Sequence, residues 1–313
     1  MRRLGFAVKV LGDGGLPSHD TRRWQSGPHL SRSLQHLEAI LRYLDRHDIR
    51  MYRMASALAP YASHPDMPRF HGQVSECEAQ LAGLGDLART LGIRLSFHPG
   101  QYTVLNSERA EVRAAAIADL ELQAAILGAM GLDDEAVVVI HVGGAAGGVE
   151  AGLERFLAGY ERLGRAGQAR LVVENDDRSF DLSAVLWLHE RTGIRVVWDA
   201  LHHRCHDRHG IPADEALARA LDTWPAALTP KIHYSSPRLD IDVRRTRDGR
   251  RVRERIVIPP LRAHADLIDP LAFEAFLGLA GRGRDFDVML EAKAKDLALL
   301  ELRTRMHTQT ANS

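Results

Sequence analysis

The chain has few cysteines, no excess charge and no long apolar run, and each absence excludes a class of protein. Two cysteines, Cys77 and Cys205, occur in 313 residues, which argues against a disulfide framework and favours a reducing compartment. The 41 basic and 41 acidic residues balance, so no overall charge points to a polyanionic partner, although a local basic face would suffice for nucleic acid. No apolar stretch approaches the roughly 20 residues of a membrane span, and the run after Met1-Arg2-Arg3 is too short for a signal peptide. We therefore expect a cytoplasmic globular protein.

The sequence also lacks the glycine pattern of a nucleotide-binding fold. Residues 143–148 read Gly-Gly-Ala-Ala-Gly-Gly after a predicted strand, but this spacing differs from Gly-x-Gly-x-x-Gly and the acid that would bind a ribose is missing. We interpret this stretch as a flexible loop.

What the sequence does contain is a regular alternation of strand and helix patterns. Residues 30–46 repeat apolar side chains at helical spacing, and residues 194–198 form the short β-branched run typical of a buried parallel strand. The predicted strands are residues 4–8, 49–54, 93–97, 136–140, 171–173, 194–198, 231–234 and 286–290. Eight strand–helix alternations predict an α/β fold, a (β/α)8 TIM barrel, with an open doubly wound sheet as the alternative. We expect one domain over residues 1–300 and a frayed tail over residues 301–313.

Ionisable side chains stand at the C-terminal ends of six predicted strands. They are His98, His141, Glu174, Asp199, His233 and Glu291. In a barrel these ends converge on one mouth, where active sites form. One histidine at a strand end is more often structural, but burying six such groups together without metal or protonation would be costly. The pattern predicts a multi-metal centre, and imidazole and carboxylate ligands without thiolate suit Mn²⁺, Zn²⁺ or Fe²⁺.

The stretch after the sixth strand supports two interpretations. Asp199 followed three residues later by His202 can present two metal ligands to one pocket. Alternatively, Asp199 is a helix N-cap followed by surface histidines. Glu174, in the middle of the set, can bridge two ions, and paired metals activate water and stabilise an in-line phosphoryl displacement.

Several motifs resemble those of the UV-damage endonucleases. They are Tyr52-Arg53-Met54-Ala55-Ser56, Ser63-His64-Pro65-Asp66, Ser96-Phe97-His98-Pro99-Gly100-Gln101-Tyr102, Val139-Ile140-His141-Val142-Gly143-Gly144, Val173-Glu174-Asn175-Asp176, Trp198-Asp199-Ala200-Leu201-His202-His203, Lys231-Ile232-His233-Tyr234-Ser235-Ser236 and Met289-Leu290-Glu291-Ala292-Lys293. The resemblance covers residues 3–296. It implies a TIM barrel related to endonuclease IV that nicks duplex DNA immediately 5′ to ultraviolet photoproducts with three metal ions, commonly taken to be manganese.

The resemblance also implies roles for single residues. It assigns one ion to His98, His141 and Glu174, a second to Glu174, Asp199, His233 and Glu291, and a third to His202 and His264. Asp266 is left outside this set. Lys231, two residues before His233, faces the same side of its strand. In similar enzymes this lysine can be carboxylated. We expect Lys231 and Glu174 to be catalytic. The alternative for Lys231 is a lysine whose ammonium contacts phosphate.

Two further segments are candidates for DNA contact. By the resemblance, Gln101 and Tyr102 form a wedge, because an aromatic ring can stack where bases separate and an amide can fill the vacated space. Residues 238–255 contain eight arginines and four acids. Such a run is usually a solvated loop, but near the barrel mouth it can follow the phosphate backbone.

We weighed three functions. The expected one is a damage-directed endonuclease, acting as a monomer on damaged duplex DNA and leaving 3′-hydroxyl and 5′-phosphate ends. The alternative is a metal-dependent sugar isomerase or epimerase of the xylose-isomerase-like barrel type, which usually needs one metal pair and a closed polar pocket. A non-catalytic DNA-binding barrel with a decayed site is disfavoured by the complete ligand set.

Overall fold

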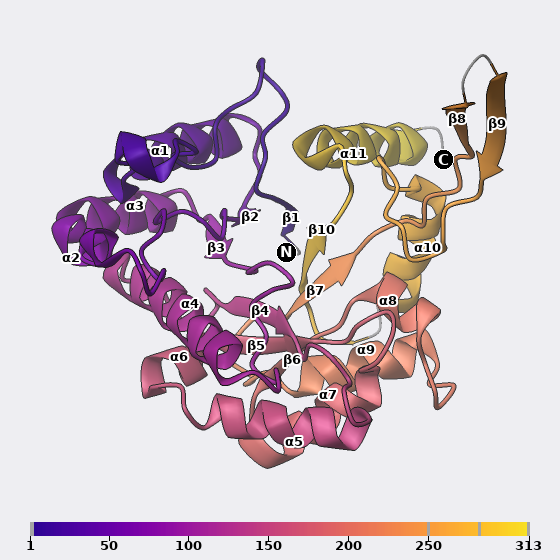
Figure 1. Ribbon diagram of the computed structural model, residues 1–313. Coiled ribbons are helices and arrows are strands. Elements are labelled where there is room, and N and C mark those ends of the chain that lie inside the picture. The colour runs from indigo at the N-terminus through magenta and orange to yellow at the C-terminus, as the bar shows by residue number, and fades with distance from the viewer. Residues whose placement is uncertain (1–2, 249–250, 281–282, 312–313) are drawn as a thin grey trace.

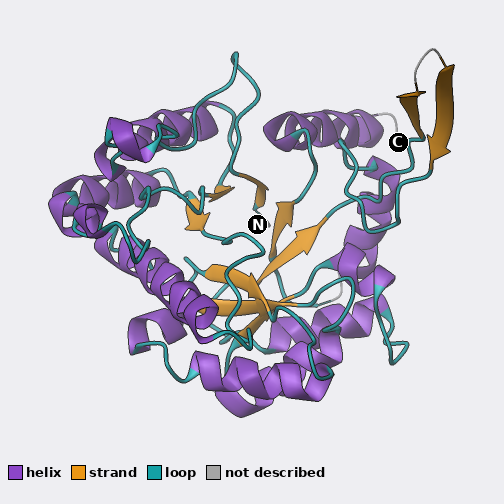
Figure 2. Cartoon of the chain, viewed as in Figure 1, coloured by secondary structure: helices purple, strands orange, loops and turns teal. Residues whose placement is uncertain are grey.

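The computed structural model describes residues 3–248, 251–280 and 283–311. Parallel strands form its centre and helices surround them (Figures 1 and 2). The central strands are β1 (Leu4–Ala7), β2 (Met51–Arg53), β3 (Arg94–Ser96), β4 (Val138–His141), β5 (Leu171–Glu174), β6 (Arg195–Val197), β7 (Lys231–Tyr234) and β10 (Asp287–Leu290). Most of their side chains are buried, which explains why they occur as short β-branched and apolar runs.

Two hydrogen-bonded sheets join to close the barrel. One has the strand order β3-β2-β1-β10-β7 and the other β4-β5-β6. Parallel bridges connect them at Phe97 with Val138 and at Asp199 with His233. The predicted TIM barrel is therefore confirmed, and the open doubly wound sheet is wrong.

The helices follow the strands in the predicted alternation. They are α1 (Leu30–Arg46), α2 (Gln73–Glu76), α3 (Glu78–Thr90), α4 (Ala110–Ala129), α5 (Val149–Tyr160), α6 (Arg165–Arg170), α7 (Leu182–Thr192), α8 (Ala200–Cys205), α9 (Ala213–Asp222), α10 (Pro270–Ala280) and α11 (Lys295–Ala311). Helix α1 buries the apolar stripe that predicted it, and His29 caps it by accepting a hydrogen bond from the Ser31 amide. Gly5 is required where β1 meets β2, because a Cβ there would lie 2.5 Å from the carbonyl oxygen of Met51.

The arginine-rich segment forms a hairpin, which the sequence patterns did not predict. Strands β8 (Asp242–Asp248) and β9 (Arg251–Val257) pair antiparallel, with Val243 opposite Ile256. An ion pair of 2.7 Å between Arg245 and Glu254 adds a cross-strand contact. The hairpin projects from the barrel beside α10 (Figure 1).

The C-terminal segment also differs from expectation. Helix α11 continues to Ala311, and Leu299 and Leu302 are buried in the core. Residues 301–311 are therefore helical where a frayed tail was expected, and residues 312–313 lie outside the described residues. In the part of the chain that the structure describes, no helix is long and apolar enough to cross a membrane.

Candidate metal centre

Glu174, at the end of β5, lies at the centre of the predicted ligands. The carboxylate is fully buried. Its Oε2 atom lies 3.0 Å from Nε2 of His98 and 3.7 Å from Nε2 of His141. Its Oε1 atom lies 3.0 Å from Nδ1 of His233 and 3.5 Å from Nδ1 of His202. Three imidazoles at strand ends and a fourth, that of His202 on α8, thus surround one carboxylate.

Within the described residues, three groups of side chains converge closely enough to hold a cation. They are His98 with Glu174 and His233, His141 with Glu174 and His202, and Glu174 with Asp199, His233 and Glu291. The four-residue group is the one that the resemblance assigned to a single ion. The other two groups divide His98 and His141 between them, whereas the resemblance placed both histidines on one ion. Glu174 belongs to all three groups, as a bridging carboxylate would.

Unpartnered polar atoms in this cluster fit a metal. Among the described residues, Oε1 of Glu174, Oδ2 of Asp199, Nδ1 of His141 and both ring nitrogens of His233 are buried without a well-oriented hydrogen bond, although Oε1 of Glu174 and Nδ1 of His233 lie 3.0 Å apart. Buried polar atoms are normally hydrogen-bonded, so such a concentration needs an explanation. Imidazole nitrogens and carboxylate oxygens at this spacing are the donors that Mn²⁺, Zn²⁺ and Fe²⁺ accept.

Both interpretations of Asp199 correspond to observed features. Its Oδ1 atom caps α8 by accepting a hydrogen bond of 2.7 Å from the His202 amide, so the N-cap prediction is confirmed. Its Oδ2 atom is the unpartnered one. Asn175 fixes the backbone of Asp199 from both sides, accepting from the amide at 2.9 Å and donating to the carbonyl at 3.2 Å. His202 is buried, which excludes the surface position in the alternative.

His264 reaches the mouth from the return segment of the hairpin. Its backbone pairs with Pro237, and its Nδ1 atom lies 2.8 Å from the carbonyl oxygen of Glu291. Its ring centre is 6.0 Å from that of His202. His264 belongs to none of the three convergent groups among the described residues, so its place beside a third ion stays a prediction.

The charges in the cluster shift one another's proton affinity. Burial raises the pKa of Asp199, although the neighbouring His202 partly offsets this. Burial would also raise the pKa of Glu174, but His233 and His141 lower it well below its usual value. Burial, with repulsion from Arg94 and Arg53, lowers the pKa of Lys231, whose Nζ atom is buried without a hydrogen bond.

Comparison with known proteins identifies the family. The family model described as UV-endonuclease UvdE matches residues 29–311. The chain belongs to this family. The UV DNA damage endonuclease of Bacillus pumilus (strain SAFR-032) is 34% identical over 258 residues, covering 82% of this chain and 74% of that protein. The corresponding protein of Bacillus mycoides (strain KBAB4) is 33% identical over 274 residues, covering 87% and 80%. The predicted resemblance and the prediction of an endonuclease are confirmed.

Solved structures agree with this assignment to the UvdE family. The crystal structure of SacUVDE superposes with a TM-score of 0.81 at 29% identity, covering 99% of both chains. D-psicose 3-epimerase from Clostridium cellulolyticum H10 gives a TM-score of 0.52 at 12% identity, covering 93% of this chain and 85% of that one. The second likeness shows a shared barrel fold alone.

In this barrel, Gln101 and Tyr102 lie at the tip of a turn beside the candidate metal centre. The Thr103 amide donates to the Gly100 carbonyl at 3.0 Å, and the Thr103 hydroxyl donates to Asp119 at 3.2 Å. Tyr102 is 83% exposed. Gln101, His98, His141 and His202 line one cleft of about 420 Å³. The turn is anchored at its base while its tip stays free.

Two residues of the site were missed in the sequence. Asn175 orients Asp199, and Arg53 ends β2 with Nη1 2.5 Å from Oε1 of Glu291. Arg53 occupies a strand end just as the six predicted residues do. Its position was a usable signal, but a cation is not a metal ligand, so Arg53 was not among the expected residues.

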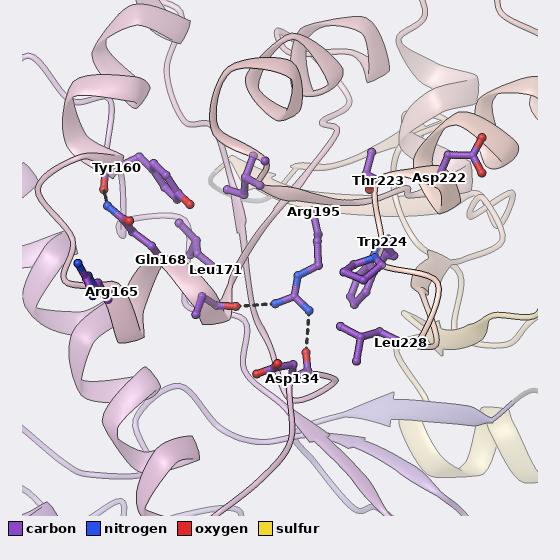
Figure 3. A pocket seen from close by; sticks show the side chains of 14 residues that line it. Asp134, Tyr160, Arg165, Gln168, Leu171, Arg195, Asp222, Thr223, Trp224 and Leu228 are labelled. Atoms are coloured by element: carbon purple, nitrogen blue, oxygen red, sulfur yellow. Dashed lines mark hydrogen bonds between the residues drawn. The ribbon is translucent and has the colours of Figure 1, made fainter.

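A larger cleft of about 680 Å³ lies away from this chemistry (Figure 3). Arg195 on its wall donates to the carbonyls of Asp134 at 2.7 Å and Ala169 at 2.6 Å, and lies 4.9 Å from the ring centre of Trp224. None of the predicted site residues lines this cleft. Its buried cation already has acceptors, so we assign it a structural role.

Proposed function

We propose that this UvdE-family protein recognises ultraviolet photoproducts, and also abasic sites, in duplex DNA and hydrolyses the phosphodiester immediately 5′ to the lesion. The products are a 3′-hydroxyl and a 5′-phosphate. The single observation that carries the proposal is the Glu174 cluster, with four imidazoles within 3.7 Å of one carboxylate at the mouth of the barrel. An enzyme that acts on one site in a duplex needs no second subunit, so we expect a monomer.

Three divalent ions, Mn²⁺ by preference, complete the centre in this proposal. In the proposal they are held by the side chains of eight residues: His98, His141, Glu174, Asp199, His202, His233, His264 and Glu291. When bound, such ions lower the pKa of water and neutralise charge on the phosphate under attack. Glu174 would contribute its carboxylate to more than one ion, since it belongs to all three convergent groups, and Asn175 keeps the Asp199 backbone in place beside the cluster.

Lys231 has a separate place in the proposal. Its buried Nζ atom has no hydrogen-bond partner among the described residues, and its lowered pKa favours the neutral amine that reacts with carbon dioxide. Carboxylation turns a cation into an anion facing the metal ions. Intact mass measurement under native conditions should show one added carbon dioxide, which Lys231→Met should remove; plain lysine in the wild type would count against it.

The turn at Gln101 and Tyr102 supplies the wedge. An exposed aromatic ring on an anchored turn can insert between bases at a lesion, where stacking is already weakened. Replacing both residues by alanine should weaken binding to a damaged duplex and leave binding to an undamaged duplex unchanged. Equal binding of the damaged duplex by variant and wild type would refute the wedge.

The hairpin binds phosphates outside the cleft. Neutralising Arg244, Arg245, Arg253 and Arg255 to glutamine should flatten the slope of log affinity against log salt, by about one unit for each phosphate that the variant no longer binds. The matched control replaces four exposed arginines on the outer helices, Arg42, Arg191, Arg219 and Arg305. Equal slopes for the two sets would exclude a specific role for the hairpin.

The decisive experiment uses a labelled duplex with one photoproduct, an abasic duplex and an undamaged duplex, each with Mn²⁺. We expect one cut directly 5′ to the photoproduct and none in the undamaged strand. Glu174→Ala should abolish the cut, while Glu190→Ala, on the exposed face of α7, should not. If the metal-loaded wild type cuts neither damaged duplex, the proposal is wrong and sugar substrates should be screened.

A further inference from the structure

Arg53 makes an ion pair inside the ligand cluster. Its Nη1 atom lies 2.5 Å from Oε1 of Glu291, and the same oxygen lies 3.4 Å from Nδ1 of His233. Glu291 is one of the four residues that converge to hold a cation. The guanidinium therefore occupies an acceptor position that a divalent ion would also use.

The surroundings of Arg53 differ from those of a structural arginine. Arg53 makes one side-chain hydrogen bond among the described residues, to Glu291, although a guanidinium carries five N–H donors. Its side chain is 13% exposed. Arg94, near the opposite end of the barrel, is by contrast 1% exposed and donates to Asp287 and to two main-chain carbonyls. Arg53 thus has unused donors and access to the mouth.

Two lysines gather positive charge beside Arg53. Lys295 begins α11 at a φ of 52°, and Lys9 follows Val8, whose φ of 66° is unusual for a β-branched residue. Burial and repulsion from Arg53 lower the pKa of Lys295, with a further contribution from Lys9. Strained backbone of this kind collects at functional sites. Glu291 offsets these positive charges in the metal-free protein, and a second anion would be needed if a metal took its carboxylate.

We propose that Arg53 binds a phosphate of the DNA strand at the barrel mouth and that, in the metal-free protein, it pairs with Glu291 instead. A metal that takes the Glu291 carboxylate frees the guanidinium, whose planar fork matches two phosphate oxygens. This inference rests on the proposed endonuclease function. It adds a substrate-contacting residue and couples metal binding to phosphate binding.

The coupling predicts two opposite effects of Arg53→Met. Removing the cation ends its competition for Glu291 and its repulsion of the ion, so Mn²⁺ should bind about threefold or more tightly. Removing a cation from the substrate phosphate should slow nicking by on the order of 100-fold. A purely structural ion pair gives another pattern, since its loss misplaces Glu291 and weakens both metal binding and nicking.

The experiment measures Mn²⁺ affinity without DNA by electron paramagnetic resonance, and single-turnover nicking of the photoproduct duplex. Arg53→Lys keeps the charge but not the fork, so it should bind Mn²⁺ nearly as the wild type does and recover only part of the nicking rate. Arg3→Met is the matched control, because Arg3 is a partly buried arginine paired with Asp287 and Glu135 away from the mouth. Both of its readouts should stay unchanged.

A second measurement locates the phosphate. Each phosphate around the lesion is replaced in turn by a neutral methylphosphonate, and the rate penalty is compared between wild type and Arg53→Met. At one phosphate position, the methylphosphonate should slow nicking by the wild type but should not slow nicking by Arg53→Met. Weaker Mn²⁺ binding by Arg53→Met, or undiminished penalties at every position, would overturn the inference. If the wild type nicks no damaged duplex, the endonuclease proposal itself fails, while the Mn²⁺ titration still tests the competition.

Discussion

The two ends of the barrel both bury charged side chains, but they treat them differently. At the N-terminal end, Asp287 accepts from Arg94 at 2.9 Å and from the Arg3 amide at 2.9 Å. Glu135 there accepts from Arg3 at 2.7 Å and from the Thr229 amide at 2.8 Å. Among the buried side-chain atoms of this described network, only Nη2 of Arg94 lacks a hydrogen bond, and the Arg94 guanidinium lies 5.5 Å from the ring centre of Trp224.

At the mouth, by contrast, carboxylates and imidazoles crowd together with unpartnered atoms. Oε1 of Glu174, Oδ2 of Asp199 and both ring nitrogens of His233 have no hydrogen bond in the described structure. Buried charges stabilise a fold only when their partners are complete. The difference indicates that the N-terminal network stabilises the fold. The cluster at the mouth instead has polar atoms whose partners must come from bound ions or substrate.

The largest expected effect comes from breaking the complete network. Arg94→Met removes a partner of the fully buried Asp287 and should lower the free energy of unfolding by about 3–5 kcal/mol. Mn²⁺ affinity should change far less than stability, because Arg94 makes no hydrogen bond to a proposed metal ligand. Denaturant titration with and without Mn²⁺ measures both quantities. A loss below about 1 kcal/mol would show that the two ends do not differ as described.

Binding of metal ions at the mouth should have the next largest effect on the free energy of unfolding. Mn²⁺ at 100 times its dissociation constant should stabilise the fold by about 2.7 kcal/mol, and a chelator should reverse this. Thermal unfolding at increasing Mn²⁺ concentrations measures the effect. Glu174→Gln should reduce it strongly, whereas Arg3→Met should keep it; an equal response in both variants would place the ions elsewhere.

The smallest effect concerns acid stability at the N-terminal end. Burial would raise the pKa of Glu135, but hydrogen bonds from Thr229 and the charges of Arg94 and Arg3 lower it overall. A lowered folded pKa means that the contribution is present above the unfolded value of about 4.3 and is lost as pH falls through the folded value. Glu135→Gln should cost about 1 kcal/mol at pH 7 and make stability less dependent on pH below about 4.3. Unchanged pH dependence would exclude the role.

Much of this architecture could be predicted because the barrel requires a simple pattern. Strands buried on both faces need short apolar runs, and ligands at their ends follow directly, as Glu174 after Leu171–Val173 shows. The hairpin escaped prediction because most of its residues are charged and strand patterns are recognised by alternating apolar residues.

Within the site, the identity of the ligands could be predicted better than their grouping. Six strand ends specify which side chains meet, but not that His98 lies with His233 and His141 with His202. That division depends on side-chain directions and on small shifts between strands. Arg53 escaped for another reason, since an arginine at a strand end is not a metal ligand and only the structure shows its contact with Glu291, 238 residues away in the sequence.

The closure of the barrel gives the metal ligands a mechanical role. The three-stranded and five-stranded sheets meet at two narrow seams, one held by main-chain hydrogen bonds of Phe97 with Val137 and Val139, the other by the His233 amide and the Trp198 carbonyl. If the barrel opens, its strands should separate first at these two seams, because the fewest main-chain hydrogen bonds join the strands there. Asp199 and His233 face each other across the second seam, and His98 adjoins the first. An ion held by Asp199 and His233, as proposed, would therefore also be a crosslink that holds the wall of the barrel shut.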